Sequence, residues 1–515
     1  MPDAAPAPSM LLTSDTQPAY THQQILRVVF GIMLCIFLAS LDQTVVIPAV
    51  PAIAADLEAF GHLSWIVTAY LLTTTAATPI IGKLSDIYGR RALLIPSLAL
   101  FIAASMACGF AQTLPQLIIA RAIQGLGGAG LFAMAQAAIA DVVSPRERGR
   151  YQGYMASMWG VSSIAGPIVG GYVTDHLSWR WVFWANLPFG LLAMLLCNRA
   201  LMLIRHQRRP ARIDWGGAAL LVACVTSWLL LLSWGGSEFP WQSTPILLLA
   251  AAGLVLLAAL IRVEGRVADP ILPPHMFRNT AFLRGVSIAF FTSLGLFGAT
   301  FLMPLFLQLV LGFDASTSGL LVVPYLGSNV LGAIVSGQTA RYVGRVKAIV
   351  VAGLAGVVLA FTGLAAMSAD TSLWLVLPCT VVLGVGTGLT MPAVLMQVQN
   401  AAERRDVGAA TGSLLFLRSM GGAFGSTVVG ALLAMRFNDG LRAAGVVAKV
   451  DLGALRGGTA TIAGVSLQTA RAALTGGFHL AFAVCAGLLA LALIVALGMN
   501  DLPLRSSFTP KELAH

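Results

Sequence analysis

Charged side chains are scarce in this sequence. Only 10% of its 515 residues are Asp, Glu, Lys or Arg, whereas a soluble globular protein carries about 25%. Hydrophobic residues make up 57%, and the mean hydropathy is +0.84. So few charges could not cover a globule of this size in water. The composition therefore excludes a water-soluble protein and predicts an integral membrane protein in a lipid bilayer.

Several motifs that define enzymes are missing as well. The sequence has no nucleotide-binding glycine loop, no HExxH pair and no cluster of His and Asp. We therefore predict that the chain is not an enzyme and that it uses no cofactor and no metal. The six cysteines form no CxxC pair and lie almost entirely in apolar runs. They indicate buried thiols rather than a disulfide framework or a metal site.

The net charge of +10 does not indicate a nucleic-acid partner, because no basic stripe is interleaved with aromatic residues. The basic residues instead occupy alternate loops, as the positive-inside rule describes. We therefore predict a bacterial cytoplasmic (inner) membrane protein with both termini in the cytoplasm. The opposite short loops hold Asp56, Glu58, Asp175, Glu238, Asp314 and Asp370, with Arg180 as their base. The basic loops hold Lys83, Arg90, Arg91, Arg146, Arg148, Arg150, Arg205, Arg208, Arg209, Arg212, Arg262, Arg266, Arg278, Arg284, Arg341, Arg345, Lys347, Arg404 and Arg405.

The apolar runs predict the architecture. A spanning helix needs about 20 mostly apolar residues, which gives fourteen spans: 26–50, 63–82, 92–111, 115–140, 151–174, 181–203, 215–234, 245–262, 285–311, 317–340, 348–367, 373–398, 408–435 and 476–498. Without Lys or Arg, the first 25 residues lack the basic start of a signal peptide. We expect an all-α membrane protein with these parts: a disordered cytoplasmic tail (1–25), a six-helix bundle (26–203), a linker with two extra helices (204–284), a second six-helix bundle (285–498) with a long external loop (436–475), and a cytoplasmic tail (499–515).

A motif repeats between the two halves. The stretch "GKLSDIYGRRALL" (82–94) returns, weakened, as "GQTARYVGRVKAI" (337–349). Each copy follows the second span of its half and opens a tight turn, as expected for the internal repeats of secondary transporters. One reading is a basic loop that only sets topology; the repeat favours a conformational latch between neighbouring helices. The residues proposed for it are Gly82, Asp86, Gly89, Arg90, Arg91, Gly337, Arg341, Gly344 and Arg345.

One acid lies deep in the first span. Asp42 sits in "FLASLDQTVVIPAVP", although a charged side chain at a helix centre costs roughly 2.5–3.5 kcal/mol. The spans between 285 and 398 contain no acid, so Asp42 is the single candidate for carrying a proton. Pro48 and Pro51 are expected to bend or end this helix near its outer mouth.

One base lies inside the fourth span. Arg121 cannot shed its proton and must find acceptors when buried, and Gln124 shares its helix face at i+3. Snorkelling to the interface is the alternative. We expect Arg121 and Asp42 to be partners in proton coupling.

Small residues mark two further spans. "GVSSIAGPIVGG" (160–171) predicts close helix packing with a bend, either as static packing or as the pivot of a gate. Its proposed gating residues are Gly160, Gly166, Pro167, Gly170 and Gly171. "WRWVFWANLPFG" (179–190) is typical of an aromatic belt that anchors the outer interface. Arg418, in a second packing face, is an intramembrane base with no evident acid partner.

These motifs resemble the major facilitator superfamily, in its branch of fourteen-span drug:proton antiporters. The turn at 82–91, Arg121 with Gln124 and Gly125, and the fifth-span glycines match that branch. The first-span motif matches at Asp42, Thr44 and Pro51 and departs at Ile47–Pro48. The resemblance covers nearly the whole chain, and the fifth-span motif is typical of exporters in this superfamily.

The resemblance implies multidrug efflux by rocker-switch antiport. Ionised Asp42 would help to capture a lipophilic substrate, cationic or neutral, and its protonation on the outer side would displace that substrate. The chain would act as a monomer, with a periplasmic adaptor left open. A dedicated exporter of one metabolite, lipid or antibiotic is the alternative, and a non-transporting sensor or embedded transferase is a third. The expected cavity residues are Thr44, Trp65, Tyr70, Thr73, Gln124, Gln308, Asn329, Met391 and Gln397.

Overall fold

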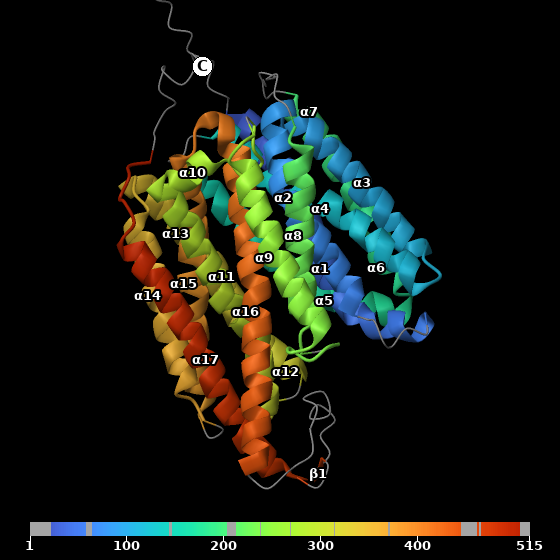
Figure 1. Ribbon diagram of the computed structural model, residues 1–515, viewed down its shortest axis with the longest axis vertical. Helices are drawn as coiled ribbons and strands as arrows, with labels where there is room; N and C mark the ends of the chain where they lie inside the picture. The colour runs from blue at the N-terminus through green and yellow to red at the C-terminus, as the bar shows by residue number, and fades with distance from the viewer. Residues whose placement is uncertain are drawn as a thin grey trace, which may run out of the picture.

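Long helices make up nearly all of the computed structural model (Figure 1). It describes residues 22–57, 64–143, 147–202, 213–236, 238–267, 269–313, 315–368, 371–443, 461–462 and 465–504. Among these, the strands are β1 (Thr461–Ile462) and β2 (Val465–Ser466), which form one short antiparallel hairpin. Apart from this hairpin, the regular structure of the described residues is therefore helical.

The first half of the chain forms one group of helices. They are α1 (His22–Asp56), α2 (Ser64–Tyr88), α3 (Arg90–Phe110), α4 (Leu114–Val142), α5 (Arg148–His176), α6 (Arg180–Trp184) and α7 (Asn186–Leu201). Two helices follow as a hairpin, α8 (Trp215–Trp234) and α9 (Thr244–Glu264), which pack on one another.

The second half begins with the short α10 (Pro274–Arg278). The helices that follow are α11 (Thr280–Leu309), α12 (Ala315–Leu320), α13 (Val323–Val343), α14 (Lys347–Ala365), α15 (Leu373–Ala401), α16 (Val407–Ala443) and α17 (Leu467–Leu497), with a 3-10 turn at Arg404–Asp406.

The two halves repeat the same packing scheme. In the first half α1 packs on α5, α2 on α4, and α3 on α4 and α7. In the second half α11 packs on α16, α13 on α15, and α14 on α15 and α17. Across the molecule α2 packs on α16 and α13 packs on α5. The second helix of each half therefore packs on the fifth helix of the other, as an internal two-fold repeat requires.

Eleven helices in the described part of the chain are long and apolar enough to cross a membrane. The count of fourteen spans stays a prediction. Its three remaining members correspond to α5, α11 and α13, and α5 and α13 carry many Gly, Ser and Tyr residues where they pack on each other. Polar and small side chains lower the hydropathy of a span without preventing its burial between other helices.

Several predicted boundaries differ from the structure. The span predicted at 181–203 is divided into α6 and α7, and the one at 317–340 into α12 and α13. The predicted external loop at 436–475 is wrong at both ends, because α16 continues to Ala443 and α17 begins at Leu467.

The first helix also runs past its prolines. Pro48 and Pro51 lie inside α1, which continues to Asp56, so the prediction that they end the helix is wrong. The predicted N-terminal tail lies almost entirely outside the described residues, as do parts of the C-terminal tail and of the external loop.

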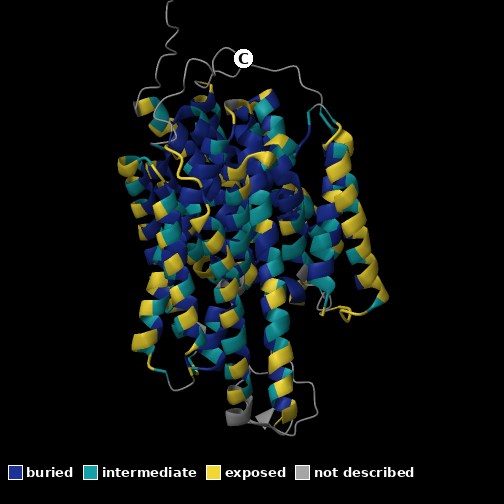
Figure 2. Ribbon diagram, turned by 60° about the vertical axis from the view of Figure 1, so that its left-hand side comes forward, coloured by how far each residue is buried: buried dark blue, intermediate teal, exposed yellow. Residues whose placement is uncertain are grey.

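Burial follows the arrangement of the helices (Figure 2). Buried residues gather between the helices, and exposed residues cover the outward faces of the peripheral ones. In the candidate span of α9, only 17% of residues are buried inside the protein. Large exposed apolar side chains on such a helix are typical of contact with lipid.

Candidate functional site

Asp42 lies at the centre of a buried hydrogen-bond network in the first half. Its side chain is 0% exposed. Its Oδ2 accepts a hydrogen bond from Arg121 Nη1 at 2.7 Å, and its Oδ1 accepts from Gln124 Nε2 at 2.8 Å and from Asn186 Nδ2 at 2.9 Å. Helices α1, α4 and α7 thus supply the carboxylate and its donors. The predicted pairing of Asp42 and Arg121 is present as a direct ion pair.

Arg121 is equally well satisfied. Its Nη1 also donates to Gln124 Oε1 at 2.7 Å, and its Nε donates to the Ile66 carbonyl oxygen at 3.1 Å. The Tyr70 ring lies under the guanidinium, with its centroid 4.4 Å away. At 1% exposure the side chain points into the bundle, so the alternative of snorkelling to the interface is wrong.

The paired charges give this network a chemical function. A buried ion pair is tolerated only while both partners remain, and loss of one leaves a charge that costs about 3–5 kcal/mol. A proton on Asp42 would remove the negative member and leave Arg121 to find other acceptors. The packing of α1, α4 and α7 around this site therefore depends on both charges of the pair being present.

Asn186 is a member of this network that the sequence analysis missed. The motif around it was interpreted as interfacial anchoring only. In the structure Asn186 Nδ2 donates both to Asp42 and to Ser105 Oγ at 2.9 Å, and the residue is buried. The available signal was an amide side chain at the start of an apolar run, where a buried polar group needs a partner.

A second set of polar contacts joins the two halves along α2 and α16. Asp86, near the end of α2, accepts hydrogen bonds from the backbone N–H groups of Gly408 at 2.9 Å and Ala409 at 2.8 Å. These groups lie at the start of α16, where a carboxylate is stabilised by the helix dipole. Arg90 forms ion pairs with Asp86 at 2.6 Å and with Asp141 at 2.8 Å. The first copy of the repeated motif thus connects helices of opposite halves.

The backbones of α2 and α16 also approach each other closely where the two halves meet, a contact that we call the first seam. A Cβ atom on Gly82 would lie 2.6 Å from the carbonyl oxygen of Gly408. Both copies of the motif turn at a glycine in the left-handed region, with φ of 93° at Gly89 and 71° at Gly344. A residue with a Cβ atom would clash at Gly82 and would be strained at the positive φ angles of Gly89 and Gly344.

The second copy of the motif makes the equivalent seam between α13 and α5. Gly337 lies directly against the backbone of Gly149, leaving no room for a Cβ atom on either. Arg341 Nε pairs with Glu147 Oε1 at 2.9 Å, with both side chains 41% exposed. This seam therefore carries an exposed ion pair where the first seam carries a buried one.

Both seams close the same end of the molecule. Lys83, Arg90 and Arg341 lie at this end, which we call the arginine-rich end. It is uppermost in Figure 1. Toward the opposite end α5 is less tightly packed: Gly171 has no atom within 4 Å of its Cβ position, and Tyr172 is 64% exposed. The structure is closed at its arginine-rich end.

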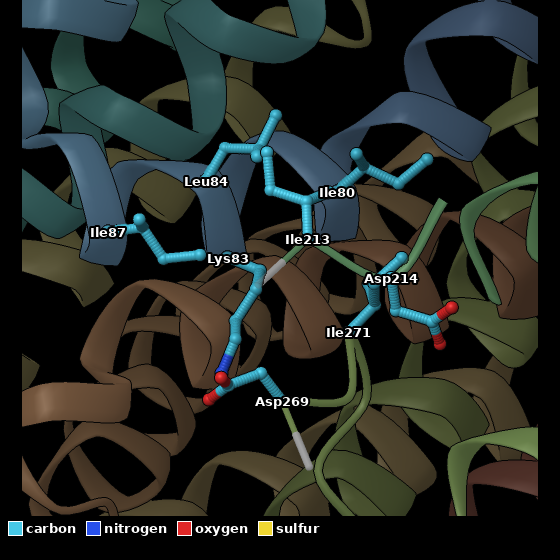
Figure 3. Close-up of a pocket in the computed structure, with 8 residues that line it drawn as sticks. All are labelled: Ile80, Lys83, Leu84, Ile87, Ile213, Asp214, Asp269 and Ile271. Carbon is cyan, nitrogen blue, oxygen red and sulfur yellow. The ribbon is translucent and has the colours of Figure 1, made fainter. Parts of the chain in front are cut away.

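A pocket lies beside the first seam (Figure 3). The side chains of Lys83 and Asp269 point toward one another at its edge. The rest of the lining is mostly apolar and comes from α2 and from the segments flanking the α8–α9 hairpin: Ile80, Leu84, Ile87, Ile213, Asp214 and Ile271. The pocket therefore marks where the hairpin docks on α2 and lies far from Asp42.

Comparison with known proteins identifies the family. The sequence profile described as "Major Facilitator Superfamily" matches residues 32–426. The chain belongs to the major facilitator superfamily. The multidrug transporter protein MdtP of Bacillus subtilis is 37% identical over 406 residues, covering 79% of this chain and 75% of that protein. The efflux pump FUS6 of Gibberella fujikuroi is 32% identical over 449 residues, covering 84% and 79% respectively.

Solved structures share the major facilitator fold. The human organic anion transporter MFSD10 (TETRAN) superposes with a TM-score of 0.63 at 16% identity, covering 92% of this chain and 99% of that one. The proton:xylose symporter XylE superposes with a TM-score of 0.64 at 14% identity, covering 94% and 97%. The chain is thus a membrane transporter with efflux-pump relatives, and not an enzyme.

The fifth-span motif of the superfamily packs against the helix that carries Asp42. Gly166 lies against Thr44, and Gly170 lies against the backbone of Val45. Thr44 Oγ1 also donates to the Ser162 carbonyl oxygen at 2.9 Å. These contacts support the static-packing reading, while the pivot stays a prediction. Gly171 makes no such contact, and its proposed gating role stays a prediction.

The predicted cavity residues are mostly occupied with packing. Tyr70, Gln124 and Gln397 are buried at 1%, 0% and 0% exposure, so they do not line an open cavity in this conformation. Asn329 donates to Thr387 Oγ1 at 2.6 Å, and Trp65 contacts Trp234 edge to face. The half-buried members of the set are Thr44, Trp65, Thr73, Gln308, Asn329 and Met391.

Two arginines of the repeated motif contact their own half. Arg91 donates to Asn198 Oδ1 at 3.0 and 2.8 Å, and Arg345 pairs with Asp501 at 3.0 Å. Neither of these contacts crosses to the other half, and the role of both arginines in a latch between neighbouring helices stays a prediction.

Proposed function

We propose that this chain is a proton-coupled exporter of lipophilic compounds, of the fourteen-span drug:proton antiporter branch. The observation that carries the proposal is the Asp42–Arg121 pair. Its carboxylate is fully buried inside a span and accepts hydrogen bonds from three side chains. The names of relatives such as MdtP and FUS6 support export of toxic compounds. We place the chain as a monomer in the bacterial inner membrane, with both termini cytoplasmic and with the domain boundaries of the sequence prediction.

The coupling is indirect in this proposal. Because Asp42 is fully buried in this conformation, we propose that it acts on the substrate here through the packing of its helix, while direct capture by ionised Asp42 stays a prediction for the inward-facing state. Protonation instead neutralises Asp42, frees Arg121 from its main partner and loosens the packing of α1 on α4. Each proton that moves down a gradient supplies about 2.3 kcal/mol per 100 mV.

Opening and closing of the two seams would switch the transporter between states that are open to opposite sides of the membrane. With α2 on α16 and α13 on α5 closed at the arginine-rich end, the binding region is open toward the opposite side. Substrate release would take place from this state. Return to the other state requires Asp86 to leave the start of α16 and Gly337 to separate from Gly149.

Resistance and dye efflux in an efflux-deficient bacterial strain test this function. We expect the full-length chain to raise resistance to several unrelated lipophilic compounds, and a protonophore to abolish the effect. The Asp56→Asn variant is the matched control for Asp42→Asn. Asp56 also pairs with an arginine (Arg180, 2.8 Å), but this pair lies at the exposed outer end. Resistance that survives the protonophore would refute proton coupling, resistance to one compound alone would favour a dedicated exporter, and no resistance would favour a sensor.

A further inference from the structure

Arg418 lies in the middle of the membrane-spanning part of α16. It is 11 residues beyond Val407, the first residue of the helix, or ~16 Å at 1.5 Å per residue. That is about half of the 30 Å hydrocarbon core. Met420, two residues further on, packs in one cluster with Ala76 at the centre of α2. The guanidinium is therefore attached at mid-depth.

Its electrostatic situation is the opposite of that of Arg121. Arg121 has a carboxylate, an amide oxygen and a carbonyl oxygen as acceptors. Arg418 forms no hydrogen bond and no ion pair with any residue that the structure describes. Among the described residues, the ionisable side chain that interacts with it electrostatically is Tyr325 of α13. An arginine keeps its charge at any cellular pH, so Arg418 is an uncompensated positive charge.

The position of Arg418 on α16 leaves it accessible. One edge of the helix packs on α11, where Gly421 and Gly425 lie against the backbones of Phe290 and Leu294. The other edge carries Ser419 and Ser426, which are exposed. Arg418 lies between these edges and is half-buried.

The two groups that interact lie on different helix pairs of the second half. Tyr325 belongs to α13, which packs on α15, whereas α16 packs on α11. The guanidinium is therefore close enough to α13 for the two side chains to interact electrostatically.

We propose that Arg418 binds an acidic group, a carboxylate, sulfonate or phosphate, of the exported molecule. This inference rests on the proposed export function and specifies its substrate class as lipophilic anions. Guanidinium matches such oxygen pairs with two parallel hydrogen bonds. Asp42 cannot offset the preference, because its charge is sealed against Arg121 and away from the second half. The same uncompensated charge repels cationic compounds from this region.

Three dansyl probes that differ only in charge test the proposal on the purified full-length protein. Dansylglycine is anionic, dansylglycinamide neutral and dansylethylenediamine cationic. We expect the wild type to bind dansylglycine at least about tenfold more tightly than the cationic probe, which corresponds to ~1.4 kcal/mol. Arg418→Gln should abolish this preference and leave the affinity for the neutral probe unchanged.

Two variants control for structure and for general charge. Arg418→Lys keeps the charge and should retain most of the preference. Arg436→Gln removes an exposed base from the same helix and should change nothing. Thermal unfolding of all variants separates loss of folding from loss of binding. If Arg418→Gln fails to fold, Arg418→Met, which is also uncharged, takes its place and must abolish the preference for dansylglycine.

The outcomes separate this inference from the function on which it rests. A wild type that prefers the cationic probe, that binds no dansylglycine, or whose preference survives Arg418→Gln overturns the inference, even if it exports probes with a proton gradient. Conversely, Arg418-dependent binding of dansylglycine without proton-driven export of any probe from proteoliposomes supports the anion site and refutes the proposed function.

Discussion

Replacing Asp86 by asparagine tests whether the seam between α2 and α16 holds the arginine-rich end closed. Asp86 accepts two backbone hydrogen bonds from the start of α16, at 2.9 and 2.8 Å, and pairs with Arg90 at 2.6 Å. Both side chains are nearly buried, at 5% and 6% exposure. The variant removes the negative charge and keeps one acceptor oxygen.

The expected cost follows from these contacts. A hydrogen bond to a charged group contributes about 1.5–3 kcal/mol, and a carboxylate at a helix N-terminus adds roughly 0.3–1 kcal/mol. Because asparagine retains one acceptor, we expect a net loss of about 1–2 kcal/mol from the closed state. That is a change of about 5–30-fold in the ratio of closed to open molecules.

Double electron–electron resonance measures this ratio directly. Spin labels at Ala92→Cys and Tyr342→Cys, both exposed and on opposite halves, report the separation at the arginine-rich end once the six native cysteines are replaced by alanine. Asp86→Asn should move a measurable population to longer distances.

Glu147→Gln is the matched control at the other seam. Its ion pair with Arg341 is 41% exposed on both sides, so its loss should cost about 0–1 kcal/mol and shift the distribution little. An unchanged distribution in Asp86→Asn, or an equal shift in both variants, would refute the reasoning.

Two further substitutions probe the other contacts. Gly337→Ala should push α13 and α5 apart, because its Cβ would meet the backbone of Gly149, and the same spin labels should then report a larger open population. Gly327→Ala, on the same helix with nothing within 4 Å of its Cβ position, should leave the distances unchanged. If Gly337→Ala also left them unchanged, the seam would not be tightly packed. Asn186→Leu removes one of the donors to Asp42 and should lower the free energy of unfolding, measured by thermal unfolding, by about 1–3 kcal/mol. Asn198→Leu, which loses a hydrogen bond to Arg91 at the surface, is the control. Equal stability of the two variants would contradict the proposed network.

The polar residues inside apolar runs could be predicted from the sequence. Asp42 and Arg121 stand out because each is a charge in a segment that should have none, and a buried arginine must find an acceptor. The repeated turn motif likewise predicted contacts between neighbouring helices, whose role as a latch stays a prediction. What the motif did not predict is that Asp86 contacts Gly408 in the other half, since a local pattern does not name a partner 322 residues away.

The cavity residues were much harder to predict. In a membrane protein, the lipid and the protein interior are equally apolar, so hydrophobic periodicity does not tell the lipid-facing side of a helix from the packed side. Tyr70 and Gln397 were expected to line a cavity and are instead fully buried. Asn186 was missed for the same reason, since its orientation toward Asp42 depends on the rotation of α7.

Proton-driven transport by Asp42→Asn in proteoliposomes tests the central claim most directly. With a dye that the wild type exports, an imposed pH gradient should accelerate wild-type and Asp56→Asn transport alike. Asp42→Asn should retain exchange of dye across the membrane without a gradient, and it should lose the acceleration, because asparagine at this position cannot take up a proton. Gradient-driven export by Asp42→Asn equal to that of the wild type would contradict the assignment of Asp42 as the proton carrier.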